Sequence, residues 1–159
     1  MKGPKTIVGI DPGLYGAFAA IRRCSNGAHL IEVCDTPRNQ GHLDPTGMSE
    51  LVFSYAEPDT EFYIERQQPF GCDSRRASFT TGQRYGYWIA ALMIARARYC
   101  IIAPRTWQQR FGIWNSSAAS TKEASLILAK SYFPGIDFAG KDGRSDATLI
   151  GVYGCLKYQ

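Results

Sequence analysis

The chain has 159 residues, 45% of them hydrophobic, and a formal net charge of +4. This length suits one domain with its own core, so we expect a single domain over residues 1–159. No apolar run approaches the roughly 20 residues of a membrane-spanning helix, which argues against a membrane protein. The five cysteines include no C-x-x-C pair, which argues against a zinc knuckle or a disulfide framework and favours a reducing compartment.

The order of apolar runs and turn residues predicts an α/β domain. We expect strands at residues 5–10, 17–23, 28–36, 61–65 and 99–103, and helices at 49–56, 78–98, 104–111, 121–132 and 144–156. Ser120, followed by Glu123 three residues later, is the expected N-cap of the helix at 121–132. Because three strands joined by short turns precede the alternating helices and strands, we predict a five-stranded mixed sheet flanked by helices, with the first strand central.

Positive charge is concentrated in the middle of the chain. Residues 1–65 carry five basic and nine acidic side chains, whereas residues 66–144 carry twelve and four. Such a basic surplus is typical of a surface that binds a polyanion such as DNA, although a merely solvated surface gives the same count. The charge alone leaves both readings open.

Four acidic residues form the candidate site. Asp11 and Glu65 end the first and fourth predicted strands, which places them at one edge of the sheet, where open α/β sheets carry their sites. Asp142 and Asp146 are four residues apart and share a face if the last helix includes both. The alternatives are a turn aspartate at 11, a solvated strand end at 65 and a helix cap at 142.

Carboxylates that converge in this way repel one another unless cations lie between them. Oxygen ligands select Mg²⁺ or Mn²⁺, and two such ions about 3.5–4 Å apart can promote phosphodiester hydrolysis without a His, Cys or Lys nucleophile. His29 and His42 fall in the early hairpin and loop and suit surface or packing roles. A glycine-rich phosphate loop is not evident, so we expect no nucleotide cofactor.

The sequence resembles RuvC-type Holliday junction resolvases along nearly its whole length. The first family motif is similar to IVGIDPGLYGAFAAI, the second to FYIERQQPF, and the C-terminal metal-binding helix to KDGRSDATLIGVYG. Between them, TTGQRYGYWIAAL, APRTWQQRFG and TKEASLILAKSYFP resemble the phage and chloroplast branches of the family. Single pieces such as GIDPG are weak signals, whereas all of them in this order are specific.

The resemblance implies an RNase H-like fold and a crossover junction endodeoxyribonuclease that resolves four-way DNA junctions by symmetric cuts, leaving 5′-phosphate ends. It assigns catalysis and metal binding to Asp11, Glu65, Asp142 and Asp146, with two Mg²⁺ (or Mn²⁺) ions per site; relatives have Asp or His at the position of Asp142. A homodimer would match the near two-fold symmetry of such a junction. We expect residues 88–93 of the long helix to supply the contact, with Ala90, Ala91 and Ala95 allowing close approach, although the same residues would pack equally well against the sheet.

The expected DNA-binding residues combine the resemblance with positive charge. The family's junction-reading segment corresponds to Gln68, Gly82, Arg84 and Tyr85, and basic residues would neutralise phosphates. The full set is Gln68, Arg75, Arg76, Gly82, Arg84, Tyr85, Lys122, Lys141 and Arg144. Gly82 and Gly86 each cost a helix about 1 kcal/mol relative to Ala, which suggests close backbone approach, and Tyr85 can stack on a base or simply pack on the sheet. We expect Trp107 to be a core residue.

Three other functions compete with the resolvase. A sugar or acetate kinase-like ATP-binding lobe shares the strand and D-x-G turn but needs a second lobe. A silent junction-binding module would lack the acidic site, and an RNase H-like or transposase-like nuclease would differ only in its binding face. We expect a cytoplasmic protein, in the host cytoplasm if phage-encoded, because the N-terminus leaves no room for a signal peptide; a chloroplast location would require that a transit peptide had been removed.

Overall fold

A computed structural model describes residues 3–25, 27–69, 71–114, 118–138 and 142–158, without the side chains of residues 118–120 and 142. Five strands form one mixed sheet in the order β3-β2-β1-β6-β7. They are β1 (Thr6–Asp11), β2 (Ala17–Cys24), β3 (Gly27–Asp35), β6 (Thr60–Glu65) and β7 (Tyr99–Ile102). The β1–β2 and β2–β3 pairs are antiparallel, whereas the β1–β6 and β6–β7 pairs are parallel. The predicted mixed sheet with a central first strand is confirmed.

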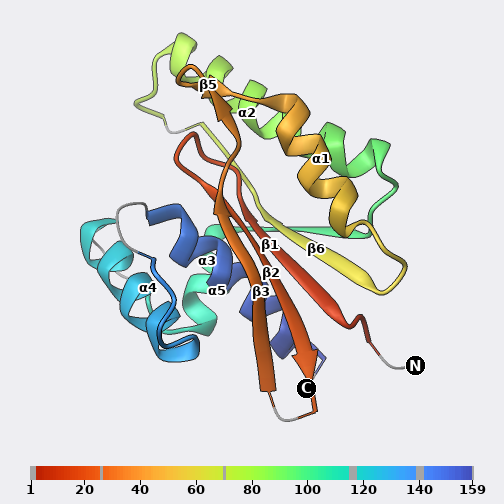
Figure 1. Ribbon diagram of the computed structural model, residues 1–159. Coiled ribbons are helices and arrows are strands. Elements are labelled where there is room, and N and C mark those ends of the chain that lie inside the picture. Colours follow the sequence, from red (N-terminus) through yellow and green to blue (C-terminus); the bar gives the residue numbers. More distant parts are fainter. Residues whose placement is uncertain (1–2, 26, 70, 115–117, 139–141, 159) are drawn as a thin grey trace.

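Helices cover both faces of this sheet (Figure 1). On one face lie α1 (Pro45–Tyr55) and α2 (Arg75–Ile94), whose buried side chains meet Val8, Phe18 and Ile64. On the other face lie α3 (Pro104–Arg110), α4 (Ala118–Tyr132) and α5 (Asp142–Leu156). Successive strand residues alternate between the two cores because neighbouring side chains of a strand point to opposite faces.

A short hairpin between β3 and α1 was not predicted. It consists of β4 (Arg38–Asn39) and β5 (His42–Leu43), paired antiparallel. Gln40 and Gly41 connect the two strands with φ angles of 48° and 81°, the left-handed conformation that two-residue hairpin turns require. Two-residue strands carry too little periodicity to be recognised from sequence.

The first two helices begin earlier than predicted because polar side chains cap them. Asp44 accepts a hydrogen bond from the Thr46 N–H at 3.1 Å, so α1 starts four residues before the predicted position. Ser74 accepts from the Ala77 N–H at 3.1 Å, so α2 starts three residues early. The predicted extension of α2 to residue 98 is wrong, because the helix ends at Ile94 and Arg96 adopts a φ of 51°.

The two C-terminal helices also start before their predicted positions. The helix α4 begins at Ala118, so Ser120 lies within its first turn and the predicted N-cap is wrong. The helix α5 begins at Asp142, two residues early, and therefore includes both Asp142 and Asp146. Across the described ranges, the structure has no helix with the length and hydropathy needed to span a membrane.

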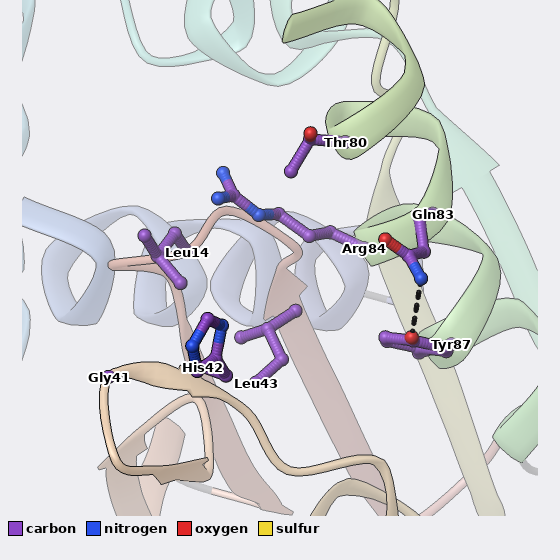
Figure 2. A pocket seen from close by; sticks show the side chains of 8 residues that line it. All are labelled: Leu14, Gly41, His42, Leu43, Thr80, Gln83, Arg84 and Tyr87. Atoms are coloured by element: carbon purple, nitrogen blue, oxygen red, sulfur yellow. Dashed lines mark hydrogen bonds between the residues drawn. The ribbon is translucent and has the colours of Figure 1, made fainter. Parts of the chain in front are cut away.

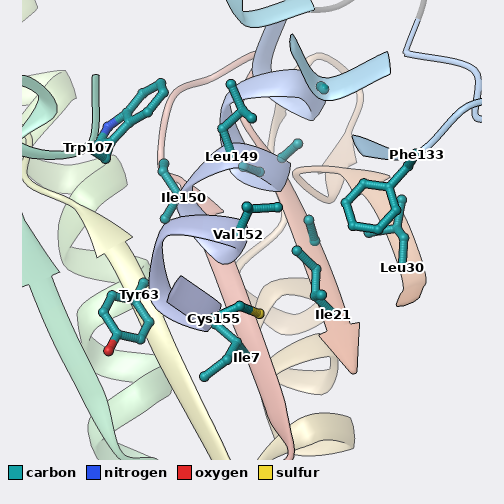
Figure 3. Close-up of a cluster of buried hydrophobic side chains, with 14 of the residues drawn as sticks. Ile7, Ile21, Leu30, Tyr63, Trp107, Phe133, Leu149, Ile150, Val152 and Cys155 are labelled. Atoms are coloured by element: carbon teal, nitrogen blue, oxygen red, sulfur yellow. The ribbon is translucent and has the colours of Figure 1, made fainter. Parts of the chain in front are cut away.

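The helix α5 lies unusually close to the sheet. A Cβ atom added at Gly9 of β1 would overlap the Ala147 carbonyl oxygen and the Gly151 amide nitrogen of α5. Figure 3 shows α5 side chains, among them Ile150 and Val152, packed over the strands. The glycines let the helix backbone contact the strand backbone, and this contact sets the height of α5 above β1.

Candidate active site

Two predicted site residues end adjacent strands. In the parallel pair of β1 and β6, Ile10 is paired with Ile64, and the next residues along the two strands are Asp11 and Glu65. Because both strands run in the same direction, their carboxyl ends meet at one edge of the sheet. The expected placement of these two acidic residues at one edge is confirmed.

The turn after β1 is tightly folded around Asp11. The Gly13 N–H donates to Asp11 Oδ1 at 3.2 Å, and the Gly16 N–H donates to the Gly13 carbonyl at 3.1 Å. A Cβ atom at Gly16 would overlap the Asp11 carbonyl oxygen. The alternative reading of Asp11 as a turn-organising residue is thus also correct, and the same hydrogen bonds hold its carboxylate at the sheet edge.

The start of α5 packs directly against this turn. A Cβ atom at Gly143 would overlap the Tyr15 carbonyl oxygen and approach the Gly16 Cα to 2.6 Å. One turn further along the helix, Asp146 precedes Ala147, whose carbonyl oxygen faces Gly9 of β1. Asp146 is therefore carried to the edge where Asp11 and Glu65 end their strands, and its Oδ1 atom is buried. Asp142 is the first residue of the same helix.

The three described carboxylates influence one another. Burial, together with the negative charges of Asp11 and Asp146, raises the pKa of Glu65 from 4.5 to about 8. A hydrogen bond from Trp107 Nε1 to Glu65 Oε2, at 2.7 Å, opposes this rise. The Gln67 amide also donates to Glu65 Oε1 at 3.4 Å. In the protein without metal, Glu65 therefore keeps a proton at neutral pH.

Trp107 has a role that the sequence reasoning missed. The prediction of a core residue is confirmed, since its side chain is 0% exposed, but its indole N–H also donates to Glu65. A buried tryptophan needs a partner for this group, and α3 follows β7, the strand next to β6. A tryptophan in the first turn of that helix was the available signal.

The carboxylates have the chemistry of a divalent-cation site. Carboxylate oxygens are the ligands that Mg²⁺ and Mn²⁺ prefer, and a cation would relieve the repulsion that raises the pKa of Glu65. Within the described residues, no three His, Cys, Asp or Glu side chains already have the spacing of a metal site. The carboxylate oxygens fit a hard cation such as Mg²⁺. Binding of that cation would have to bring the three carboxylates closer together.

The predicted DNA-binding residues lie in several elements. Arg75, Arg76 and Gly82 are exposed on α2, Gln68 follows β6, and Lys122 is exposed on α4. Space for a Cβ atom at Gly82 is free of other atoms within 4 Å, so packing within the chain does not require glycine there. Lys141 lies outside the described residues.

Arg144 is engaged within the protein. Its Nε atom is 2.8 Å from Asp35 Oδ1, which joins α5 to the end of β3. The ion pair raises the pKa of the guanidinium. Arg144 therefore helps to fix the start of α5, whatever it contacts in a complex.

Arg84 reaches from α2 toward the turn after β1. Figure 2 shows its side chain extending toward Leu14 above His42 of the hairpin, and these residues line a pocket of about 200 Å³. Tyr85 is half-buried and packs against the core under α2, which supports the packing alternative for that ring. Arg84 borders this pocket, whereas Tyr85 has a clear structural role.

Within residues 88–93, the alternative of packing against the sheet holds for part of the segment. Trp88 and Leu92 are fully buried against the sheet because they lie on the inner face of α2. The residues exposed near this end of the helix are Ala90, Met93 and Ile94. Any contact with a second copy through this segment would involve the outer face.

Solved structures with the same fold include several Holliday junction resolvases. Thermus thermophilus RuvC, solved in complex with a Holliday junction substrate, is 12% identical with a TM-score of 0.69, and the match covers 95% of this chain and 96% of that protein. The fowlpox virus resolvase is 12% identical with a TM-score of 0.63 and coverages of 97% and 99%. The yeast mitochondrial resolvase Ydc2 is 14% identical with a TM-score of 0.56 and coverages of 95% and 78%.

By sequence, no protein-family model matches the chain. No curated protein matches it either. The structural likeness establishes the predicted RNase H-like fold.

Proposed function

We propose that this chain is a crossover junction endodeoxyribonuclease, which resolves four-way DNA junctions by hydrolysing phosphodiester bonds. The observation that carries the proposal is that Asp11 and Glu65 end the adjacent parallel strands β1 and β6, and that the charges of Asp11 and of Asp146 on α5 both act on Glu65. These residues belong to a fold that matches a junction-bound resolvase over 95% of the chain. The kinase-like alternative is disfavoured, because the match to resolvases extends over nearly all of both chains.

The site would hold two divalent cations, Mg²⁺ or in its place Mn²⁺, between Asp11, Glu65, Asp146 and Asp142. Such ions lower the pKa of a bound water and stabilise charge on the leaving oxygen of a phosphodiester. Trp107 keeps the Glu65 carboxyl oriented through its 2.7 Å hydrogen bond, and the Gly13 N–H does the same for Asp11. The chain therefore supplies an acidic site with two of its carboxylates already positioned.

DNA would approach the sheet edge across α2 and the turn after β1. Arg75, Arg76 and Arg84 lie on α2 and would neutralise phosphates on that side. Gly82 leaves room for a strand to approach the helix backbone. These contacts give affinity without sequence choice, as expected for an enzyme that selects a DNA shape.

A homodimer would match the near two-fold symmetry of a four-way junction and place one site on each of two opposed strands. The outer face of α2 suits such a contact, because Met93 is 62% exposed and Ile94 70% exposed next to the small Ala90. Sedimentation of the purified protein tests this: a Met93→Lys chain should be monomeric where the unaltered chain is dimeric. An unaltered chain that sediments as a monomer at micromolar concentration argues against the dimer.

Cleavage of defined substrates tests the proposed activity. The protein and Mg²⁺ are incubated with mobile and fixed four-way junctions, linear duplex DNA and an RNA–DNA hybrid. Symmetric, ligatable nicks confined to junctions support the proposal, whereas cutting of the hybrid alone would reassign the chain to RNase H-like activity. Junction binding without cutting, in either Mg²⁺ or Mn²⁺, would instead identify a binding module.

The Asp146→Asn variant tests whether Asp146 belongs to the cutting site. It should abolish cutting and leave junction binding intact, because it removes a ligand charge without changing the side-chain shape. Asp59→Asn is the control. Asp59 lies just before β6, at the opposite end of the strand from Glu65, and forms an ion pair with Lys5 at the surface. Such exposed ion pairs contribute little to stability. Equal cutting by the Asp146→Asn and unaltered chains would remove Asp146 from the site.

A further inference from the structure

A second pocket has Glu65 in its lining. It has a volume of about 280 Å³ and lies where β6 and β7 end and α3 begins. Ala103 and Pro104 supply apolar wall, Gln67 and Gln68 supply amides, and Trp114 closes one side. Since small-molecule pockets occupy roughly 300–1,000 Å³, the space suits one small ring system. A molecule bound there would contact Glu65, which also belongs to the proposed carboxylate site.

Trp114 is the accessible tryptophan of this protein. Its side chain is 49% exposed, whereas Trp88 and Trp107 are 0% exposed. The guanidinium of Arg105 lies over the indole, 5.8 Å from the ring centroid. With the Gln109 amide turned so that its oxygen faces Arg105, that oxygen accepts from Arg105 Nε at 2.8 Å. The indole therefore lies at the mouth of the pocket beside the Arg105 guanidinium, which the Gln109 amide helps to orient.

This combination of groups matches the chemistry of a nucleotide. An exposed aromatic ring offers a stacking surface to any nucleobase, and Arg66 and Arg105 on the same pocket attract a phosphate. The amides of Gln67 and Gln68 carry both donors and acceptors for a base edge. A hydrophobic protein segment would gain nothing from two arginines and a carboxylate at the rim.

We propose that the pocket formed by Trp114, Arg105 and the residues after β6 takes the base of one unpaired nucleotide next to the phosphate that is cut. The proposal rests on the proposed junction-cutting activity and assigns Trp114 as a positioning residue of the same site. Bases near the centre of a four-way junction can leave the stack at lower cost than bases within a duplex. Capture of one such base would hold the adjacent phosphate beside Glu65.

Kinetics with damaged substrates test this. The cut position is first mapped with the unaltered protein, and junctions are then made with an abasic nucleotide on one side of the cut or the other. Removing the captured base should lower kcat/KM about tenfold for the unaltered protein, the scale of one base stacked on an aromatic ring. The loss should appear mainly in KM, because stacking binds ground state and transition state alike.

The Trp114→Ala variant and the abasic nucleotide together form a double-mutant cycle. It should cut the intact junction about tenfold less efficiently and show no further loss on the abasic junction, because the two changes remove the same contact. Trp114→Phe should retain most of the activity. Phe53→Ala is the control, since Phe53 is similarly exposed, at 53%, but lies on α1 over the opposite face of the sheet.

Fluorescence gives a readout independent of cutting. Because the other tryptophans are buried, iodide should quench mainly Trp114, and an intact junction should protect it where the abasic junction does not. Equal losses for Trp114→Ala on both junctions, or a variant that only changes the oligomeric state, would overturn the base pocket while leaving junction cutting standing. An unaltered protein that cuts no junction would instead overturn the proposed function.

Discussion

Replacing Glu65 with glutamine should change how the stability of the metal-free protein depends on pH. The pKa of this carboxyl rises from 4.5 to about 8 in the folded protein, first through burial and then through the charges of Asp11 and Asp146. Between these two pH values the folded state holds a proton that the unfolded state has released. The stabilisation from this proton is complete below about pH 4.5 and is lost as the pH rises through about 8.

The size of the effect follows from the same pKa values. Each pKa unit corresponds to about 1.4 kcal/mol of unfolding free energy. The rise from 4.5 to about 8 therefore corresponds to at most about 5 kcal/mol of stability lost between mildly acidic and alkaline pH. Water that enters the site when the carboxyl ionises would reduce this amount.

Urea unfolding in EDTA, measured at intervals from pH 5 to pH 9, checks the prediction. The unaltered protein should lose stability across this range, and Glu65→Gln should lose much less, because its amide does not ionise and can still accept from Trp107. Glu50→Gln, an exposed change on α1, is the control and should follow the unaltered curve. A Glu65→Gln curve that falls as steeply as the unaltered one would refute the argument that carboxylate crowding at the sheet edge costs stability.

Three further outcomes are expected. Gly143→Ala should destabilise the protein by about 1–3 kcal/mol in urea unfolding and slow cutting, because its methyl group would displace α5 from the turn at Gly16. Gly86→Ala is the control: it has open space around it and should instead stabilise the protein by about 1 kcal/mol. Trp107→Phe should move the acidic limb of the pH–rate profile to higher pH, since the lost hydrogen bond normally lowers the pKa of Glu65; an unmoved limb would count against that coupling. Mg²⁺ should raise the melting temperature more at pH 8 than at pH 6, because at lower pH it must displace the Glu65 proton; an equal rise would separate metal binding from Glu65.

Much of the fold could be predicted because the strands carry strong local signals. The apolar runs that became β1, β6 and β7 were found within one residue of their ends. Helix starts were less accurate, since capping at Asp44 and Ser74 depends on a single hydrogen bond each. The hairpin of β4 and β5 was missed because four paired residues show no periodicity.

Pairing across the fold was harder to foresee than secondary structure. Sequence placed Asp11 and Glu65 at one edge through the predicted strand order, but it gave no partner for Trp107 or Arg144. The bond from Trp107 to Glu65 spans 42 residues, and the ion pair from Arg144 to Asp35 spans 109. Neither pair follows from a local pattern, because each depends on how α3 and α5 dock on the sheet.

Backbone packing explains why the acidic residues of this chain meet where they do. The position of Asp146 relative to Asp11 depends on the height and register of α5, which are set by contacts that admit no side chain at Gly9 and Gly143, and on the turn after β1, which admits none at Gly16. Conservative changes at these glycines should therefore separate the carboxylates without touching any of them. The acidic residues supply the chemistry of the proposed site, whereas the glycines supply its geometry, so a search for related sites should weigh both.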